Sequence, residues 1–171
     1  MKARTKIHFI FSILIVSLVL QSCFKKEEYP IEPNIAYDSF KVFGDSATLT
    51  FNFTDGDGDL GLNDSDTLAP YDISSEFHYN IYVNYYEKDD QQGWVQGLDL
   101  DGNPVVFRYR MEPVITKGKS KGIKGKIEIG ISNGLYYNPL SDQSDTLKYD
   151  IQLIDKALHK SNIIESEVII R

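Results

Sequence analysis

The chain has 171 residues, a formal net charge of −7 at pH 7 and a pI of about 4.9. With 42% hydrophobic and 25% charged residues it can form one packed domain, which excludes wholesale disorder. The acidic balance argues against a nucleic-acid groove, a single cysteine excludes disulfides within the chain, and three histidines are too few for histidine-rich metal chemistry.

The first 22 residues have the features of a secretory signal peptide. Lys2, Arg4 and Lys6 form a basic start, and an apolar run broken only by serines follows over residues 9–20. A run of that length rises about 18 Å as a helix, well short of the roughly 30 Å of a bilayer core. This length and these flanks favour a signal peptide at 1–22 over a membrane span.

The apolar run ends in Leu20, Gln21, Ser22 and Cys23, which resembles the lipobox of bacterial lipoproteins. In that family a signal peptidase cuts before a cysteine whose thiol carries a diacylglyceryl group, although a small or β-branched residue is commoner than Gln21 at its position. The resemblance implies a lipidated Cys23 and a membrane anchor. Phe24 stands where aspartate retains enteric-type lipoproteins at the inner membrane, so the outer membrane is the expected location. The alternative is an ordinary secretory signal with an incidental cysteine.

Residues 23–34 are expected to form the lipidated cysteine and a flexible tether, in which Pro30 and Pro33 favour an extended spacer. The Lys-Lys-Glu-Glu run at 25–28 resembles the export signal of surface-exposed lipoproteins in some Gram-negative bacteria and predicts display on the cell surface; otherwise it is a solvated tether. Cleavage after Ser22 removes three of the 18 basic side chains and none of the 25 acidic ones, which leaves a net charge of about −10. Anionic headgroups repel such a domain, so acyl chains would hold it at the membrane.

From residue 35 onward, apolar and polar residues alternate with a period of two, as in half-buried strands. The alternation predicts one domain over 35–171 with about seven strands, at 35–42, 47–53, 77–85, 105–111, 123–131, 147–153 and 164–170. No stretch shows a convincing helical stripe. One apolar and one wet face on each strand predict an all-β fold, an antiparallel immunoglobulin-like β-sandwich.

The C-terminal part adds a resemblance over about 20 residues. Residues 149–157 read Tyr-Asp-Ile-Gln-Leu-Ile-Asp-Lys-Ala, and Lys-Ser-Asn follows at 160–162. This resembles the last hairpin of fibronectin type III and related bacterial immunoglobulin-like domains, where a Tyr-x-Ile-x-Leu strand leads through an Asp-x-Ala turn to the final strand. The resemblance implies a fibronectin type III-like sandwich. Leu158 and His159 replace the usual Gly-Asn of that turn.

An acidic loop follows the strand at 47–53. Asp55, Asp57 and Asp59 alternate with glycine, which resembles the Asp-x-Asp-x-Asp loops of EF-hand-like and thrombospondin-type calcium sites. Alternate residues of a tightly turning chain point the same way, glycine lets the chain wrap a cation, and calcium takes roughly six to eight oxygen ligands. On the twelve-residue loop pattern, the predicted calcium ligands are Asp55, Asp57, Asp59, the Gly61 carbonyl, Asn63 and Asp66.

The acidic loop departs from a standard EF-hand in two respects, and these change the kind of calcium site that we predict. Leu60 occupies the sixth loop position, where glycine is expected, and no flanking helices are evident, so we expect a strand-borne aspartate loop whose calcium ion rigidifies the domain. The alternative is a polar β-turn, because Asp and Gly are common turn residues. Five carboxylates in twelve residues repel one another unless a cation lies among them, which favours the calcium site.

Three aromatic residues, Tyr82, Tyr86 and Trp94, form a candidate ligand face. Exposed aromatic side chains beside carboxylates and amides are typical of sugar-binding faces, so a glycan site is one interpretation. Aromatic residues also favour strands, so packing or a protein-contact face is the other. Exposure of these side chains on one face would favour a glycan site, and burial in the core would exclude it.

No catalytic motif is evident: the sequence lacks Gly-x-Ser-x-Gly, a phosphate-binding glycine loop and zinc-ligand spacing. Asp99 and Asp101 could serve a glycosidase, but a turn explains them better. We therefore expect a non-enzymatic binding or accessory module of an outer-membrane protein complex, resembling the small immunoglobulin-like lipoproteins of Gram-negative surfaces. One alternative is a glycan-binding lipoprotein of nutrient uptake. Another is a hydrolase, which requires a deep cleft with convergent carboxylates or a contact between His78 and an acid.

Overall fold

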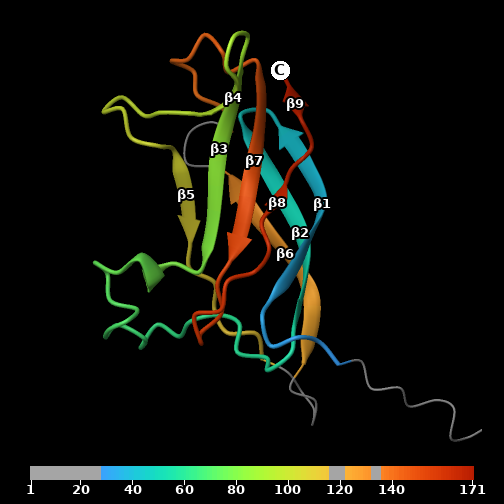
Figure 1. The fold of residues 1–171 in the computed structure, drawn as a ribbon, viewed down its shortest axis with the longest axis vertical. Coiled ribbons are helices and arrows are strands. Elements are labelled where there is room, and N and C mark those ends of the chain that lie inside the picture. The colour runs from blue at the N-terminus through green and yellow to red at the C-terminus, as the bar shows by residue number, and fades with distance from the viewer. Residues whose placement is uncertain (1–27, 116–121, 132–135) are drawn as a thin grey trace, which may run out of the picture.

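Two antiparallel β-sheets packed face to face make up the fold (Figure 1). The structure, a computed structural model, describes residues 28–115, 122–131 and 136–171. The all-β sandwich expected from the alternation is confirmed, and the described ranges add only the short 3-10 helix η2 (Glu76–His78). The expected signal peptide at 1–22 and Cys23 lie outside those ranges. Within them, no helix is long and apolar enough to cross a membrane.

The smaller sheet contains β1 (Asn34–Phe43), β2 (Ser46–Asp55) and β6 (Ile123–Ile131) in that order. β1 and β2 form a hairpin whose turn includes Gly44 with a φ of 60°, a left-handed conformation that favours glycine. β2 lies in the middle and pairs with β6 along its length, from Ala47 opposite Ile131 to Asp55 opposite Ile123. The end of β2 therefore lies beside the start of β6.

The larger sheet has β3 (Ile81–Asp89) and β7 (Thr146–Leu153) as its central pair. β4 (Gly93–Gln96) and β5 (Val106–Tyr109) lie end to end along the other edge of β3. β8 (Ile164–Glu165) and β9 (Ile169–Ile170) share the outer edge of β7 in the same way. The strand segments of the two sheets thus fill seven strand positions, the number that the alternation predicts.

Two predicted strands differ most from the structure in their bounds. The strand expected from residue 77 begins at Ile81, because Ser75 caps η2 by accepting a hydrogen bond from the Phe77 amide and the chain turns there. The last strand expected over 164–170 is split into β8 and β9. Between them the Ser166 hydroxyl accepts from the Tyr149 amide, so a side chain replaces a backbone carbonyl in the ladder. The alternation did not predict β4, which the structure contains.

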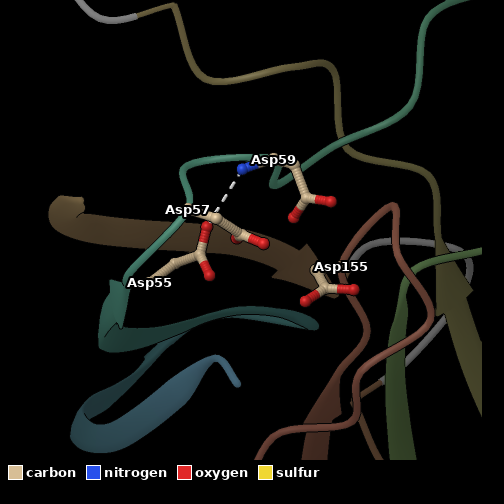
Figure 2. Close-up of side chains that lie close together, drawn as sticks. All are labelled: Asp55, Asp57, Asp59 and Asp155. Carbon is tan, nitrogen blue, oxygen red and sulfur yellow. Dashed lines mark hydrogen bonds between the residues drawn. The ribbon is translucent and has the colours of Figure 1, made fainter. Parts of the chain in front are cut away.

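The two ends of the sandwich carry different parts of the chain (Figure 1). We call the end of the sandwich where β1 begins the proximal end and the opposite end the distal end. At the proximal end β2 and β7 finish, and the acidic loop follows Asp55 (Figure 2). At the distal end β1 turns into β2, β3 finishes, and the amide of Arg171 donates to the Asp145 carbonyl just before β7. Because the chain reaches its first strand at the proximal end, that end is the one next to the N-terminal tether.

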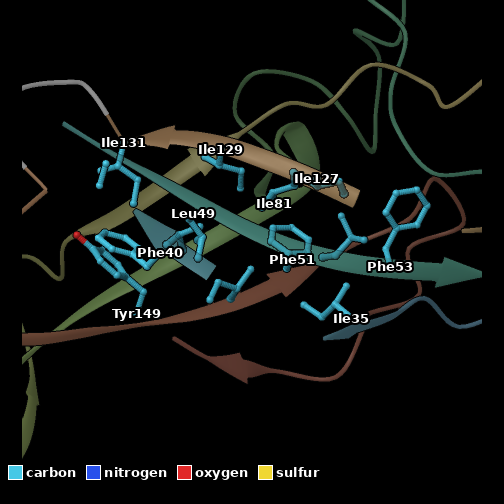
Figure 3. Close-up of a cluster of buried hydrophobic side chains, with 14 of the residues drawn as sticks. Ile35, Phe40, Leu49, Phe51, Phe53, Ile81, Ile127, Ile129, Ile131 and Tyr149 are labelled. Carbon is cyan, nitrogen blue, oxygen red and sulfur yellow. The ribbon is translucent and has the colours of Figure 1, made fainter. Parts of the chain in front are cut away.

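The core lies between the sheets and is built from the inward sides of the long strands (Figure 3). Leu49 and Phe51 of β2 have no exposed surface. Phe40 of β1 stacks on Tyr149 of β7 with ring centroids 5.3 Å apart, which joins the two sheets. Fully burying a side chain of this kind stabilises a fold by about 1.5–3 kcal/mol. The labelled core residues are Ile35, Phe40, Leu49, Phe51, Phe53, Ile81, Ile127, Ile129, Ile131 and Tyr149.

Candidate metal centre

Four aspartates converge at the proximal end of the sandwich (Figure 2). Asp55 ends β2, Asp57 and Asp59 lie in the loop that follows, and Asp155 lies in the turn after β7. Each offers one carboxylate oxygen, and these four oxygens lie within 4.8 Å of one another. The side chains of Asp55 and Asp155 are buried, with 0% and 2% of their residues exposed, and the other two are half-buried. We call this group the aspartate cluster; it could hold a metal ion.

Glycine makes the tight course of the acidic loop sterically accessible. Gly58 has a φ of 75°, which a residue with a side chain rarely adopts. A Cβ atom on Gly56 would lie 2.3 Å from the carbonyl oxygen of Tyr29, so only glycine lets the tether pack against the loop. The Asp59 amide donates to Asp55 Oδ2 at 3.1 Å and closes the turn (Figure 2).

The acidic loop is tied to the core immediately after Asp59. Leu60 is buried among the core side chains and, unlike Gly58 and Gly61, does not adopt a positive φ, so glycine is not required at the sixth position. The Leu62 amide donates to the Met111 carbonyl at 2.9 Å, and the Val114 amide donates to the Leu60 carbonyl at 3.1 Å. These contacts fix the segment that carries the aspartates against the chain that follows β5.

Asp155 is held in place by its own turn. The backbone amide of His159 donates to Asp155 Oδ1 at 2.8 Å, and His159 Nδ1 lies 2.8 Å from Oδ2. Leu158 adopts a φ of 71°, so the turn is left-handed at the position where the fibronectin type III-like pattern has glycine. The Lys156 amide donates to the Asp59 carbonyl at 3.3 Å. The turn after β7 and the acidic loop after β2 are thereby joined across the two sheets.

The electrostatics of the aspartate cluster are unfavourable without a positive charge. The Oδ1 atoms of Asp55, Asp57 and Asp59 are buried and accept no hydrogen bond. Burial, reinforced by the charges of Asp57 and Asp59, raises the pKa of Asp55 to about 6. Burial, followed by the charge of Asp155, also raises the pKa of Asp59. The site therefore requires protons or a cation.

Only part of the predicted calcium ligand set lies in this cluster. Of the predicted carboxylate ligands, Asp55, Asp57 and Asp59 belong to it and Asp66 does not, whereas the Gly61 carbonyl and Asn63 stay predictions. Gly61, with a φ of 97°, packs against the backbone of Glu112, where a Cβ would lie 2.3 Å from its carbonyl oxygen. Asp66 Oδ2 accepts from the amide of Asn63 and forms an ion pair with Lys156, both at 2.8 Å. Hydrogen bonds from Lys156 and Asn63 lower the pKa of Asp66.

Asp155 is the member of the cluster that the sequence pattern does not predict, because it lies far along the chain from the acidic loop. One usable signal existed: Asp155 opens the Asp-x-Ala turn after β7. In a sandwich where β2 and β7 finish at the same end, their following turns meet. Strand order, rather than residue spacing, brings the fourth carboxylate to the site.

The three aromatic residues of the candidate ligand face lie on the outward side of β3 and β4 and are half-buried, so they are not part of the core. Lys148 Nζ lies 5.6 Å from the ring centre of Tyr86 and 5.3 Å from that of Trp94. Lys88 Nζ lies 5.4 Å from the Trp94 ring centre. The Tyr82 hydroxyl donates to the backbone carbonyl of Glu76. The rings share one face, and lysines already contact two of them.

The residues considered for catalysis have local structural partners. Asp99 Oδ1 accepts from the amides of Asp101 at 2.9 Å and Asn103 at 2.8 Å, so the turn interpretation of the Asp99 and Asp101 pair is supported. His78 Nδ1 lies 3.0 Å from the Tyr71 carbonyl oxygen. Comparison with protein-family models and with characterised proteins finds no match for this chain. The functional argument therefore starts from the aspartate cluster.

Proposed function

We propose that this chain is a lipid-anchored outer-membrane lipoprotein, displayed on the cell surface, whose β-sandwich is stiffened by a calcium ion and acts as a non-enzymatic binding or accessory module. The buried Asp55 carboxylate carries the calcium part of the proposal. It has no exposed surface, and its Oδ1 atom accepts no hydrogen bond. A buried carboxylate with one oxygen unpaired, facing three other carboxylates, requires a compensating charge.

Calcium suits this donor set better than other biological cations. The cluster offers only carboxylate oxygens, which favour hard cations over zinc or copper. Magnesium demands near-ideal octahedral geometry and keeps most of its water, whereas calcium accepts irregular oxygen cages in which water or backbone carbonyls complete the shell. Outside the cell, even a site with a dissociation constant of about 10⁻⁴–10⁻³ M is useful.

The proposed role of the ion is mechanical, not catalytic. The cluster takes three carboxylates from the β2 end and one from the β7 turn, so a cation there joins the two sheets at the proximal end. Gly56 packs against the carbonyls of Tyr29 and Pro30, so the same loop contacts the tether. An ordered acidic loop would therefore also fix the point where the tether meets the domain.

The anchor part of the proposal is supported by the lipobox resemblance around Cys23. Residues 24–28 separate this cysteine from Tyr29, a described residue that contacts the acidic loop, and they span at most about 18 Å when extended. The proximal end would thus lie close to the membrane and the distal end would point away. Cells expressing the full chain should incorporate labelled palmitate into it, and Cys23→Ser should abolish the label. An unlabelled wild-type protein would refute the anchor.

Glycan binding in nutrient uptake is the second candidate function, favoured by the shared outward face of Tyr82, Tyr86 and Trp94. On this proposal, the lysines over the Tyr86 and Trp94 rings would be displaced by a sugar. Titration with soluble oligosaccharides, followed by tryptophan fluorescence, should then show saturable binding that Trp94→Ala abolishes. Unchanged fluorescence with a broad oligosaccharide panel would dismiss this function while leaving the calcium and anchor proposals intact.

A further inference from the structure

An apolar pocket of about 340 Å³ opens toward the distal end of the domain. It lies between the β4–β5 connection at residues 97–105 and the loop before β7 at residues 136–145. Tyr85, Phe107 and Tyr136 line its inner wall, and Leu98, Leu100 and Leu140 line its outer part. Its size lies in the range of ligand pockets, and its lining is mostly aromatic and aliphatic, as in binding sites.

The pocket is held open by hydrogen bonds between the elements around it. The Tyr85 hydroxyl donates to Glu87 Oε1 at 2.8 Å and accepts from the Asn138 amide at 3.1 Å. The Asn138 side chain donates to the Leu98 carbonyl at 3.1 Å, which links the two loops across the pocket. The site is therefore preformed, and a ligand need not order these loops on binding.

Three leucines at the pocket are unusually exposed. Leu98 is 50% exposed, Leu100 is 85% exposed and Leu140 is 68% exposed. They come from two separate loops and meet around one opening. Clustered apolar side chains that remain in water, rather than isolated ones, are typical of interaction sites.

A polar chamber of about 640 Å³ adjoins the apolar pocket and shares five lining residues with it: Leu98, Asp99, Leu100, Asn138 and Leu140. It is lined by the carboxylates of Glu87, Asp89 and Asp99, and its described lining contains no lysine, arginine or histidine. Its electrostatic field therefore favours a cation next to the apolar pocket.

One basic group lies at the margin of these two chambers. The Arg171 guanidinium stacks on the Tyr137 ring, 3.2 Å from its centre, and donates to the Ser144 hydroxyl at 3.1 Å. It is held by these partners and is not part of the lining of either chamber. The three carboxylates of the polar chamber already accept hydrogen bonds from uncharged groups such as the Ser141 hydroxyl and the Gln143 amide, but none of them forms an ion pair with a described cation, so their negative charge still attracts a cation from a ligand.

We propose that this distal site binds a segment of a partner protein that presents a large apolar side chain next to a lysine or arginine. The apolar side chain fills the pocket between the leucines, and the cation enters the acidic chamber beside it. The inference deepens the proposed binding role by naming the partner's chemistry, and it requires neither the calcium ion nor the lipid anchor. Such paired contacts, an apolar anchor and a complementary charge, are typical of the centres of protein interfaces.

The test is an NMR titration of the isotope-labelled full chain in non-ionic detergent with three blocked hexapeptides. Their central pairs are tryptophan–lysine, tryptophan–glutamate and alanine–lysine. The tryptophan–lysine peptide should shift the amide signals of Leu98, Asn138 and Leu140. The other two should bind at least ten-fold more weakly, because each lacks one of the two complementary groups. Equal binding of all three peptides, or shifts confined to the Trp94 face, would overturn the proposal.

Two variants separate this site from nonspecific hydrophobic binding. Leu140→Asp should weaken the tryptophan–lysine peptide at least ten-fold, and because Leu140 is largely exposed the fold should tolerate the change. Leu68→Asp alters an equally apolar, 80% exposed side chain outside the pocket and should leave binding unchanged. An unaffected Leu140→Asp, or an equal loss in both variants, would refute the site. The same titration in chelator should give the same result, so failure here is distinguishable from failure of the calcium proposal.

Discussion

Replacing Asp55 by asparagine should stabilise the metal-free domain and reduce its stabilisation by calcium. The substitution keeps the shape of the side chain and its acceptor for the Asp59 amide, but it removes one charge from the cluster. In chelator the variant should be more stable than the wild type, because the remaining carboxylates lose a repulsive neighbour. Calcium should stabilise the variant less than it stabilises the wild type, because the cluster loses its most buried carboxylate.

The structure sets the size of both effects. Two carboxylates whose oxygens lie 4.8 Å apart repel by about 3.5 kcal/mol at an effective dielectric constant of roughly 20. Protonation limits this cost, so we expect Asp55→Asn to raise the stability of the metal-free domain by about 1–3 kcal/mol at neutral pH. For the wild type, about 2 mM calcium acting on a site with a dissociation constant of 10⁻⁴–10⁻³ M contributes roughly 0.6–1.8 kcal/mol.

The assay is thermal unfolding of a soluble form that begins at residue 24 and retains every strand, with calcium and with chelator. Each kcal/mol corresponds to roughly 3–5 °C for a domain of this size, so the wild type should gain several degrees with calcium. Asp64→Asn is the matched control, because Asp64 is an exposed residue of the same loop outside the cluster. It should behave as the wild type. A full calcium response in Asp55→Asn, or the same loss in Asp64→Asn, would refute the site.

Three further outcomes follow from the same structure. Leu60→Ala should destabilise the domain by about 2–5 kcal/mol in chemical denaturation, because it opens a cavity where the acidic loop meets the core, and a loss below roughly 1 kcal/mol would contradict this anchoring role. Gly56→Ala should cost about 1–3 kcal/mol and speed proteolysis of the tether, since the new Cβ meets the Tyr29 carbonyl, whereas Gly130→Ala, with open space around it, should do neither. In chelator, stability should fall as the pH rises from about 4 to about 6, by an amount on the order of 3 kcal/mol. Stability falls with rising pH because the pKa of Asp55 is raised to about 6 in the folded state, so the folded state holds this proton more tightly than the unfolded chain does. A stability that does not change with pH would show that Asp55 does not cause the effect. The same conclusion would follow if Asp55→Asn showed the same pH dependence as the wild type.

The sequence predicted the sandwich well where strands are long and one-sided. In β2 the residues from Ala47 to Phe53 alternate strictly, and each inward member is buried. Alternation failed where local hydrogen bonds override it. Phe77 and Tyr79 continue the pattern of β3, yet the Ser75 cap turns the chain into η2 instead. Ser166 breaks the last strand in the same way.

The sequence predicted only those members of the aspartate cluster that lie close together along the chain. Asp55, Asp57 and Asp59 follow one another along a single loop, so their spacing reveals that they converge. Asp155 joins them because the turn after β7 lies beside the acidic loop. Asp66 lies outside the cluster and forms an ion pair with Lys156, the residue after Asp155. The distal pocket likewise combines two connections that lie far apart in the sequence, one between β4 and β5 and one between β6 and β7. These features depend on strand order, which alternation along one chain does not contain.

The opposed placement of the two ends gives this domain a direction under load. If lipid holds the chain before β1 and a partner grips the distal pocket, tension runs parallel to the strands. β1 would then slide against β2, with which it pairs from Asn34 opposite Thr54 to Phe43 opposite Ser46. In this shearing geometry the backbone hydrogen bonds between β1 and β2 bear the force together and must break together. A force across the sheet would break them one after another. A domain anchored and bound in this way would resist a pulling force along its strands.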